Sequence, residues 1–206
     1  MLRTLEEGGV RQLVLAGRVD RLRVLSGPLD PLAREILRQT PDRTDAGLWK
    51  ALGALLDRHG FEVLPQPHFL PDLLAPQGVI GGRAPTEREW ADLRRGLEVA
   101  RDLAERGIGQ AVAVRDGVVL AVEAAEGTDG MIRRLRAFGP EAVVVKASRP
   151  DQDPRFDLPA VGPRTIAYLR RAGVLALGVE AGRTLLLERA SLVVRAAEAG
   201  VALVGL

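Results

Sequence analysis

The sequence predicts an α/β fold, and three observations carry this prediction. Short apolar runs rich in valine and leucine alternate with segments whose apolar residues recur at helical spacing. Glycine or proline marks many of the boundaries between them. In the second half, two β-branched runs flank Arg115-Asp116-Gly117, which is a strong hairpin signal and adds antiparallel pairing. We therefore expect a mixed sheet with helices packed against it.

Residues 1–75 begin with a helical tail and continue as helices alternating with short strands. The first strand run is apolar and ends in glycine, which is typical of a buried parallel strand. Two strands make a thin sheet, so we expect partner strands from elsewhere, such as a second copy of the chain. The expected elements are strands at 11–17 and 61–64, a helix at 31–38, and a helix that Thr44-Asp45 opens and Gly60 ends.

A linker rich in proline and glycine is expected at 76–85, followed by a second domain at 86–206. This domain opens with a capping box, Thr86 to Glu89, and a helix of about five turns. Its other elements are expected as strands at 110–114, 118–122, 142–146, 174–179, 183–188 and 201–205, and as helices at 128–138, 163–172 and 191–199.

Composition excludes several classes of protein. The chain has 206 residues, 47% of them hydrophobic, which is enough for a core. It has no apolar run of about 18 residues, no apolar signal region and no cysteine, so we expect a cytoplasmic protein. A net charge of +2 and 3% aromatic residues give neither a basic tract nor stacking platforms, so no nucleic-acid partner is expected.

Lysine and histidine are both rare in this chain. His59 and His68 are isolated, and we interpret both as structural. Lys50 and Lys146 are the only lysines among 29 basic residues, so 29 − 2 = 27 are arginines. Lys146 ends the apolar run 143–146, where a compact ammonium can contact phosphate oxygens as a point charge. Alternatively, its stem follows a strand end and its charge stays in water.

Carboxylates lie next to the end of an apolar run, where a buried charge is costly unless it is paired or serves a ligand. Glu123, Glu126 and Asp129 surround the Gly127-Thr128 turn. A sharp turn at Gly127 would let these carboxylates converge on a divalent metal. Otherwise Thr128 is an ordinary helix N-cap, and Asp129 complements the helix dipole.

Two further polar segments favour a phosphate ligand. Residues 151–157 lie among prolines that stiffen the loop. The aspartates of this loop and Arg155 could pair with one another as a surface network. Alternatively, they supply a metal ligand, a base for water and a phosphate clamp. The segment Glu180–Thr184 follows an apolar run, and its Gly-Arg-Thr turn either offers amides and a guanidinium to phosphate or is an ordinary turn.

Taken together, these residues resemble the UDP-2,3-diacylglucosamine pyrophosphatases of lipid A synthesis, of the two-domain type that is unrelated to calcineurin-like metallophosphoesterases. The resemblance covers nearly the whole chain, and it depends on several motifs in one order. These motifs are Ala16-Gly17, Thr44-Asp45, Gly82–Pro85, Gly109-Gln110, Glu123–Asp129, Lys146, Gln152–Pro159 and Glu180–Thr184.

The resemblance implies an incomplete Rossmann-like N-terminal domain and a distinct α/β C-terminal domain. Family members carry a glycine-rich first strand and further segments before the position of Met1, so we expect a shortened N-terminal domain. The implied reaction is a Mg²⁺- or Mn²⁺-dependent attack of water on the α-phosphorus of a UDP-linked diacylated glucosamine. Its products would be UMP and diacylglucosamine 1-phosphate.

The resemblance also implies roles for particular residues. Asp157, in the Arg-x-Asp-x-Pro pattern, would be catalytic, with Asp153 second. Asp157, Asp129 and Glu126 would hold the metal. The expected substrate-binding residues are Gln110, Glu123, Thr128, Lys146, Gln152, Arg155, Thr165, Glu180, Gly182, Arg183 and Thr184.

The shortened N-terminus keeps other functions open. One is a non-catalytic protein that binds a nucleotide or a phospholipid sugar and derives from the enzyme. Another is a purely structural or oligomerisation module. We expect a homodimer with at most peripheral contact with the inner membrane surface.

Overall fold

The computed structural model describes residues 2–17, 30–40, 45–150 and 152–206, and the expected helix opening at Thr44 lies outside them. The chain divides into two compact units. The first comprises Met1–Phe69 together with Asp153–Asp157, and the second comprises Leu70–Gln152 together with Leu158–Leu206. A short segment from the second half of the sequence therefore belongs to the first unit.

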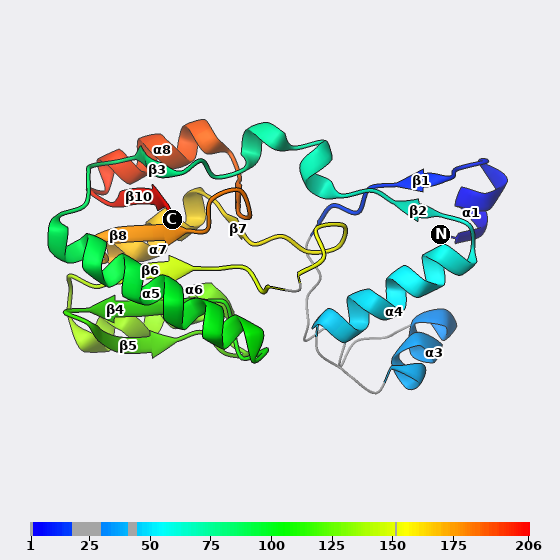
Figure 1. Cartoon of the computed structure of the whole chain (residues 1–206), viewed down its shortest axis with the longest axis horizontal. Helices are drawn as coiled ribbons and strands as arrows, with labels where there is room; N and C mark the ends of the chain where they lie inside the picture. The colour runs from blue at the N-terminus through cyan, green and yellow to red at the C-terminus, as the bar shows by residue number, and fades with distance from the viewer. Residues whose placement is uncertain (1, 18–29, 41–44, 151) are drawn as a thin grey trace. The chain divides into compact units, whose positions relative to one another are not determined.

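The first unit contains a parallel two-stranded sheet with helices around it (Figure 1). Gln12 pairs with Glu62 in register, and the Gln12 side chain donates a 2.9 Å hydrogen bond to the Glu62 carboxylate. Gly60, with a φ of +76°, turns the chain after the helix Asp45–Arg58, as the sequence predicts. The elements are α1 (Leu2–Glu7), β1 (Gln12–Leu13), α3 (Pro31–Gln39), α4 (Asp45–Arg58), β2 (Glu62–Val63) and the 3₁₀ helix η1 (Gln66–His68).

A small hydrophobic cluster forms the core of the first unit. Its buried members are Leu56, Phe61, Val63 and Phe156, each 6% exposed or less. Trp49 and other apolar side chains from α1, β1 and α4 pack against them. Phe156 is thus a core residue of the first unit although it lies far along the sequence.

The second unit is built on a six-stranded mixed sheet with the order β3-β10-β8-β6-β4-β5. The three central strands β10, β8 and β6 are parallel, and the remaining neighbours pair antiparallel. The α/β class with a mixed sheet is therefore confirmed. The strands are β3 (Gly78–Gly81), β4 (Ala111–Arg115), β5 (Val118–Val122), β6 (Val143–Lys146), β8 (Ala176–Val179) and β10 (Ala202–Gly205), and a separate parallel pair is formed by β7 (Ala160–Val161) and β9 (Leu185–Leu186).

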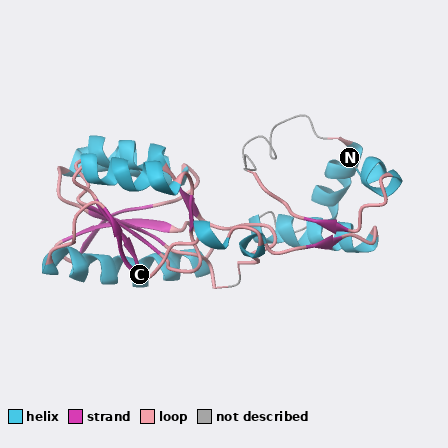
Figure 2. Cartoon of the chain, turned by 90° about the horizontal axis from the view of Figure 1, so that it is seen from above, coloured by secondary structure: helices cyan, strands magenta, loops and turns pink. Residues whose placement is uncertain are grey.

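Helices cover both faces of this sheet (Figure 2). On one face α5 (Glu87–Glu105) packs over the central strands, with Leu93 and Ala100 fully buried. A Cβ at Gly96 would lie 2.6 Å from Cγ2 of Val145, so glycine lets α5 approach β6 closely. The opposite face carries α6 (Gly127–Arg134), the 3₁₀ helix η3 (Leu135–Phe138), α7 (Pro163–Arg171) and α8 (Arg189–Glu198).

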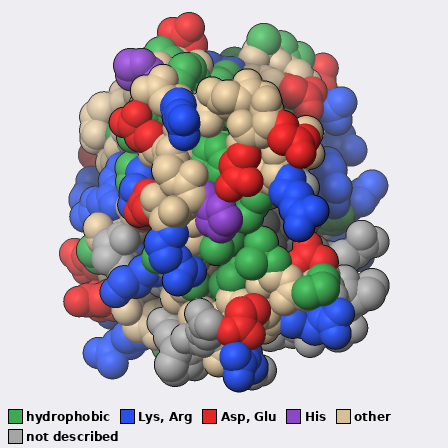
Figure 3. Space-filling view, turned by 90° about the vertical axis from the view of Figure 1, so that its right-hand side faces the viewer, with side chains coloured by type: hydrophobic (Ala, Val, Ile, Leu, Met, Phe, Trp, Pro, Cys, Tyr) green, Lys and Arg blue, Asp and Glu red, His purple; other side chains and the backbone are tan. Residues whose placement is uncertain are grey.

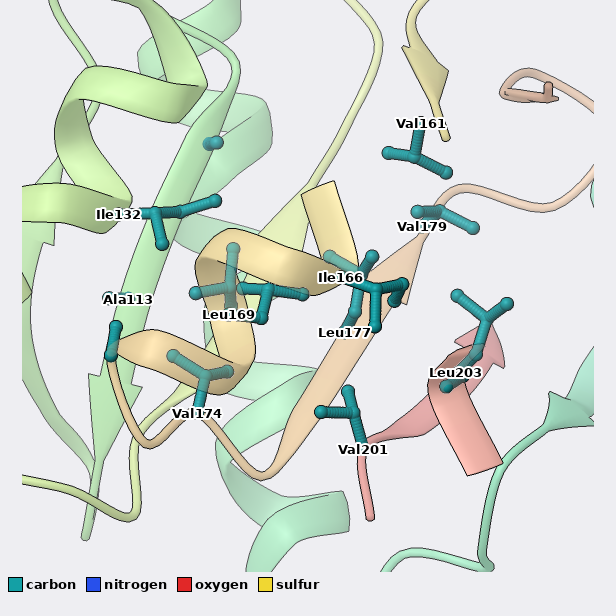
Figure 4. Close-up of a cluster of buried hydrophobic side chains, with 14 of the residues drawn as sticks. Ala113, Ile132, Val161, Ile166, Leu169, Val174, Leu177, Val179, Val201 and Leu203 are labelled. Carbon is teal, nitrogen blue, oxygen red and sulfur yellow. The ribbon is translucent and has the colours of Figure 1, made fainter. Parts of the chain in front are cut away.

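The core on the α6–α8 face is large and apolar (Figure 4). Ile132, Ile166 and Leu169 of the helices pack with Leu177 and Leu203 of the strands. These five side chains are 2% exposed or less, and burying one such side chain contributes about 1.5–3 kcal/mol. The parallel strands are consequently held between two apolar layers.

The helix and hairpin with the clearest local signals form as predicted. Thr86 and Glu89 make the reciprocal capping box at the start of α5. β4 and β5 pair antiparallel, and the residues between them, Asp116 and Gly117, both have positive φ, at 54° and 76°.

Several local features differ from the expectations, beginning with the expected strand 11–17, which is reduced to Gln12–Leu13. Part of the expected linker forms the edge strand β3, which pairs with β10, and η2 (Pro71–Leu73) precedes it. The predicted strand 183–188 is reduced to β9 in the small sheet. Thr128 lies inside α6, because the helix starts at Gly127 and its N-cap position is Glu126. The N-cap interpretation of Thr128 is therefore wrong.

The surface is mixed in character. Basic and acidic side chains are interspersed with apolar ones on the face in Figure 3. Across the part of the chain that the structure describes, no helix has the length and apolar content needed to cross a bilayer.

Candidate functional site

One edge of the six-stranded sheet gathers most of the polar residues predicted for the site. The parallel strands β6, β8 and β10 end there, and the pairing directions place the end of β5 and the start of β4 at the same edge. Glu123 follows β5, Gln110 precedes β4, Lys146 ends β6 and Glu180 follows β8. Ligands of open α/β sheets bind at the carboxyl ends of parallel strands. This edge is therefore the candidate site of the second unit.

Glu123 connects the β4–β5 hairpin to α6. One carboxylate oxygen accepts a 3.1 Å hydrogen bond from the backbone amide of Gln110, and the other accepts one of 3.1 Å from the Thr128 hydroxyl. A Cβ at Gly109 would lie 2.2 Å from the Glu123 carbonyl oxygen, so this close approach requires glycine. Glu123 thus fixes the positions of Gln110 and Thr128 at the sheet edge.

The other two carboxylates near α6 are paired with arginines. Arg134 donates to the Glu126 carboxylate and to the Val122 carbonyl. The pKa of Glu126 is lowered. The largest cause is a hydrogen bond from the Glu126 backbone amide, which together with Arg134 outweighs the effect of desolvation. Asp129 lies 3.7 Å from Arg164 of α7. The expected convergence of Glu126 and Asp129 on a metal is replaced by two ion pairs.

Among residues 2–17, 30–40, 45–150 and 152–206, no three histidine, aspartate or glutamate side chains gather as a metal-binding group. Asp157 belongs to the first unit, whereas Glu126 and Asp129 belong to the second. Glu126 and Asp129 are thus each held by an arginine, and the metal-ligand roles of these two residues and of Asp157 stay predictions.

Lys146 is a half-buried cation at the centre of the edge. Its ammonium lies 3.4 Å from the Ala160 carbonyl oxygen at the start of β7. Among the described residues it has no ion pair with a carboxylate. Its neighbours in the sheet are Ala111 and Val179. Thr165 lies further on, in the first turn of α7, where its amide donates to the Gly162 carbonyl.

Glu180 is the most buried carboxylate of the edge, at 5% exposure. One oxygen accepts two hydrogen bonds from Arg101 of α5, at 3.1 and 2.6 Å, and the other accepts one of 2.8 Å from the Ser148 amide. Desolvation raises the pKa of Glu180, but the Ser148 amide and Arg101 together lower it by more, so the net shift is downward. Glu180 is therefore held as an anion.

Arg183 and Gln152 fix the segment that follows β6. Arg183 Nη2 donates to the Arg149 carbonyl at 2.9 Å, and the Ser148 hydroxyl donates to the Arg183 carbonyl at 3.2 Å. The buried Gln152 side chain accepts a 3.0 Å hydrogen bond from the Arg149 amide. Gly182 has a φ of +69°, so the turn after Glu180 favours glycine there.

Thr184 is a buried polar residue with an unused hydroxyl. The residue is 0% exposed, and its Oγ1 makes no hydrogen bond to the described residues. Its backbone carbonyl accepts a 2.9 Å bond from Ala75. Buried hydroxyl groups normally have a partner, so this one is suited to a ligand or a bound water.

The segment Asp153–Asp157 forms a compact turn in the first unit. The amides of Phe156 and Asp157 both donate to the Asp153 carbonyl, at 3.0 and 3.2 Å. The Arg155 guanidinium donates to both carboxylate oxygens of Asp153, with a shortest distance of 2.7 Å. That contact lowers the pKa of Asp153. Asp153 and Arg155 are thus bound to each other, which is the self-paired arrangement that the sequence left open.

Both parts of the chain are similar to known protein domains. Residues 1–73 match the LpxI N-terminal domain, and residues 76–204 match the LpxI C-terminal domain. The chain belongs to the LpxI family. It is 36% identical over 159 residues to the UDP-2,3-diacylglucosamine pyrophosphatase LpxI of Caulobacter vibrioides. That alignment covers 72% of this chain and 56% of the relative, so the chain spans little more than half of the relative's length.

In this LpxI family member, the predicted site residues fall into separate groups. Gln110, Glu123 and Thr128 form one group. Gln152, Glu180, Gly182 and Arg183 form another around the segment after β6, and Lys146 and Thr184 lie beside the β7–β9 pair. Asp153, Arg155 and Asp157 belong to the first unit.

Sequence reasoning missed two residues of the site. Arg101 lies in α5 among several other arginines, so nothing local distinguishes it. Ser148 lies two residues after Lys146. Side chains two residues apart in an extended chain point to the same side, and this spacing could have identified Ser148.

Proposed function

We propose that this LpxI family member hydrolyses the pyrophosphate of a UDP-linked diacylated glucosamine. The Caulobacter relative is a UDP-2,3-diacylglucosamine pyrophosphatase, and its similarity to this chain supports the same substrate class here. The observation that carries the proposal is Lys146. A half-buried ammonium without a carboxylate partner among the described residues, at the carboxyl edge of a parallel sheet, is suited to a phosphate oxygen.

In the proposed reaction, water attacks the α-phosphorus. A new P–O bond forms to the water oxygen, and the bond from the α-phosphorus to the bridging oxygen breaks. The bridging oxygen leaves with the sugar phosphate, and the water protons are released, giving UMP and diacylglucosamine 1-phosphate. Lys146 and Arg183 would neutralise the charge that grows on the phosphate oxygens.

Asp157 is the proposed catalytic carboxylate, which orients the attacking water or holds a divalent ion. Mg²⁺ commonly uses one or two carboxylates together with phosphate oxygens of the substrate, so Asp157 fits that role without a cluster of acids. A bound Mg²⁺ would supply charge stabilisation at the phosphate. Arg155 contributes to this site through Asp153, which it holds.

The central test is UMP release from UDP-2,3-diacylglucosamine by the full chain with Mg²⁺, and again after chelation with EDTA. Asp157→Asn should lower kcat by at least about 100-fold, because loss of a group that acts on the reacting water typically costs this much. The exposed Asp102→Asn, on α5, is the matched carboxylate control and should retain the wild-type rate. Wild-type activity in Asp157→Asn would reject the assignment.

The position of attack can be tested separately with H₂¹⁸O. Attack at the α-phosphorus places the label in UMP, whereas label in the sugar phosphate would refute it. Lys146→Ala should reduce kcat/KM, and Lys50→Ala, the other lysine of the chain, is the control. A rise in Tm with UMP or UDP-sugar but no hydrolysis by the wild type would instead support the non-catalytic binding protein.

A further inference from the structure

The turn that contains Asp157 is docked in the first unit by one aromatic side chain. Phe156 is 5% exposed and belongs to the hydrophobic cluster of that unit. Its ring stacks on Trp49 of α4, with centroids 6.0 Å apart and planes 20° apart. The backbone is also held, because the Gln66 amide donates a 3.1 Å hydrogen bond to the Pro154 carbonyl.

Gly53 of α4 makes room for this ring. A Cβ at position 53 would lie 2.9 Å from Cζ of Phe156 and 3.3 Å from Cε2. Glycine in a helix interior lowers helix stability relative to alanine, so an unobstructed seat for Phe156 is the feature that glycine provides here. The helix and the turn are therefore fitted to each other at this contact.

The turn is also braced internally. The Arg155 guanidinium carbon lies 5.0 Å from the centroid of the Phe156 ring, and the guanidinium binds the Asp153 carboxylate. Two amides on the Asp153 carbonyl close the turn. The turn is thus closed on itself, and its Phe156 ring is held against α4.

We propose that Phe156, seated between Trp49 and Gly53 of α4, is the positioning residue that fixes Asp157 to the first unit. This inference rests on the proposed function of Asp157. Asp157 directly follows the seated residue, so a shift of the ring is passed to the carboxylate through one peptide unit. Misplacement of a reacting group by about 1 Å can cost about 100-fold in rate.

Gly53→Ala is the most informative variant. The new methyl group favours the helical state of α4 but pushes on the buried Phe156 ring, so its two effects on stability oppose each other while the activity should fall. We expect kcat to fall by about tenfold or more, with KM changed less than about twofold and Tm lowered no more than in Phe61→Leu. Unchanged kcat in Gly53→Ala would overturn the inference.

Two further variants separate positioning from general stability. Phe156→Leu should lower kcat, and in the double variant with Gly53→Ala the two losses should be less than multiplicative, because the smaller side chain relieves the clash. Phe61→Leu is the control, since Phe61 is equally buried in the same cluster and lies outside the turn. It should lower Tm as Phe156→Leu does but leave kcat unchanged. Equal loss of kcat in both would make Phe156 merely structural and reject the proposal.

Hydrogen exchange keeps this inference distinguishable from the proposed function. The Phe156 and Asp157 amides are bonded to Asp153 and should exchange faster in Gly53→Ala and Phe156→Leu than in the wild type or Phe61→Leu. If Asp157→Asn keeps full activity, the proposed catalytic role fails, and exchange alone decides whether Phe156 holds the turn. If Asp157→Asn is inactive while exchange and kcat of Gly53→Ala match the wild type, only the positioning role fails.

Discussion

Arg101 and Glu180 join α5 to the carboxyl edge of the sheet. Two nitrogens of Arg101 donate to one oxygen of Glu180, and the second oxygen receives the Ser148 amide. The carboxylate is 6% exposed and the guanidinium 50%, so the pair reaches from the surface to the interior. The segment after β6, which leads towards the turn that contains Asp157, is therefore tied to the longest described helix.

The first prediction concerns the pH dependence of Glu180→Gln. The folded-state pKa of Glu180 is lowered, so its ionisation stabilises the fold above the unfolded-state pKa, which is about 4.3. This contribution is lost as the pH falls through the folded-state pKa. The difference in unfolding free energy between wild type and Glu180→Gln should be constant above about pH 5 and shrink below about pH 4. Denaturant unfolding across this range measures it, and a constant difference down to pH 3 would contradict the ion-pair account.

A second prediction compares two arginines of α5. Arg101→Met removes the partner of a buried carboxylate and should cost about 1–2 kcal/mol in unfolding free energy, allowing for the exposed half of the arginine. Arg95→Met removes an exposed pair with Glu98, three residues away, and should cost less than about 0.5 kcal/mol. Equal costs would show that burial of Glu180 adds nothing to the pair.

Thr184→Val gives a third prediction, because it replaces a buried, unbonded hydroxyl with a methyl group of similar size. Without ligand, the variant should be as stable as the wild type or more stable by up to about 1 kcal/mol. If the hydroxyl serves the nucleotide or phosphate, the Tm shift produced by UMP should be smaller in the variant. A thermal-shift titration measures both effects. A destabilised variant with an unchanged UMP response would show that the hydroxyl binds water within the fold.

The fourth prediction concerns the capping box of α5. Thr86→Ala removes the hydroxyl that accepts a hydrogen bond from the Glu89 backbone amide, and it should lower the unfolding free energy by about 1 kcal/mol. Glu89→Ala should cost more, because Glu89 is 5% exposed and also pairs with Arg83, whose guanidinium donates to the Gly200 and Leu175 carbonyls. Chemical denaturation ranks the two, and the reverse order would contradict the contact geometry.

The elements predicted correctly from sequence are those with local signals. The capping box fixed the start of α5, and the Asp116-Gly117 turn fixed the β4–β5 register. β3 had no such signal, since its four residues begin and end with glycine and pair only with the last strand of the chain. Its formation depends on a partner more than a hundred positions away, which no local pattern reveals.

Prediction of the site residues was limited in the same way. Lys146, Glu123 and Glu180 could be assigned to one sheet edge because each adjoins the end of an apolar run. The placement of Asp157 could not be predicted, because the side chain that decides it, Phe156, is a single aromatic residue in a polar loop. The arginine partners of Glu126 and Asp129 were also invisible, because in a chain with 27 arginines no one of them stands out.

The placement of Phe156 has a consequence for synthesis on the ribosome. Residues 1–69 of the first unit are synthesised before Phe156, so the cluster of Leu56, Phe61 and Val63 stays incomplete until residue 156 has left the exit tunnel. These residues must therefore wait for more than eighty later residues, counted from Phe69, before the interior of the first unit closes. A nascent chain halted at residue 75 should be cleaved readily by protease, and resistance should appear only after the aromatic side chain becomes available.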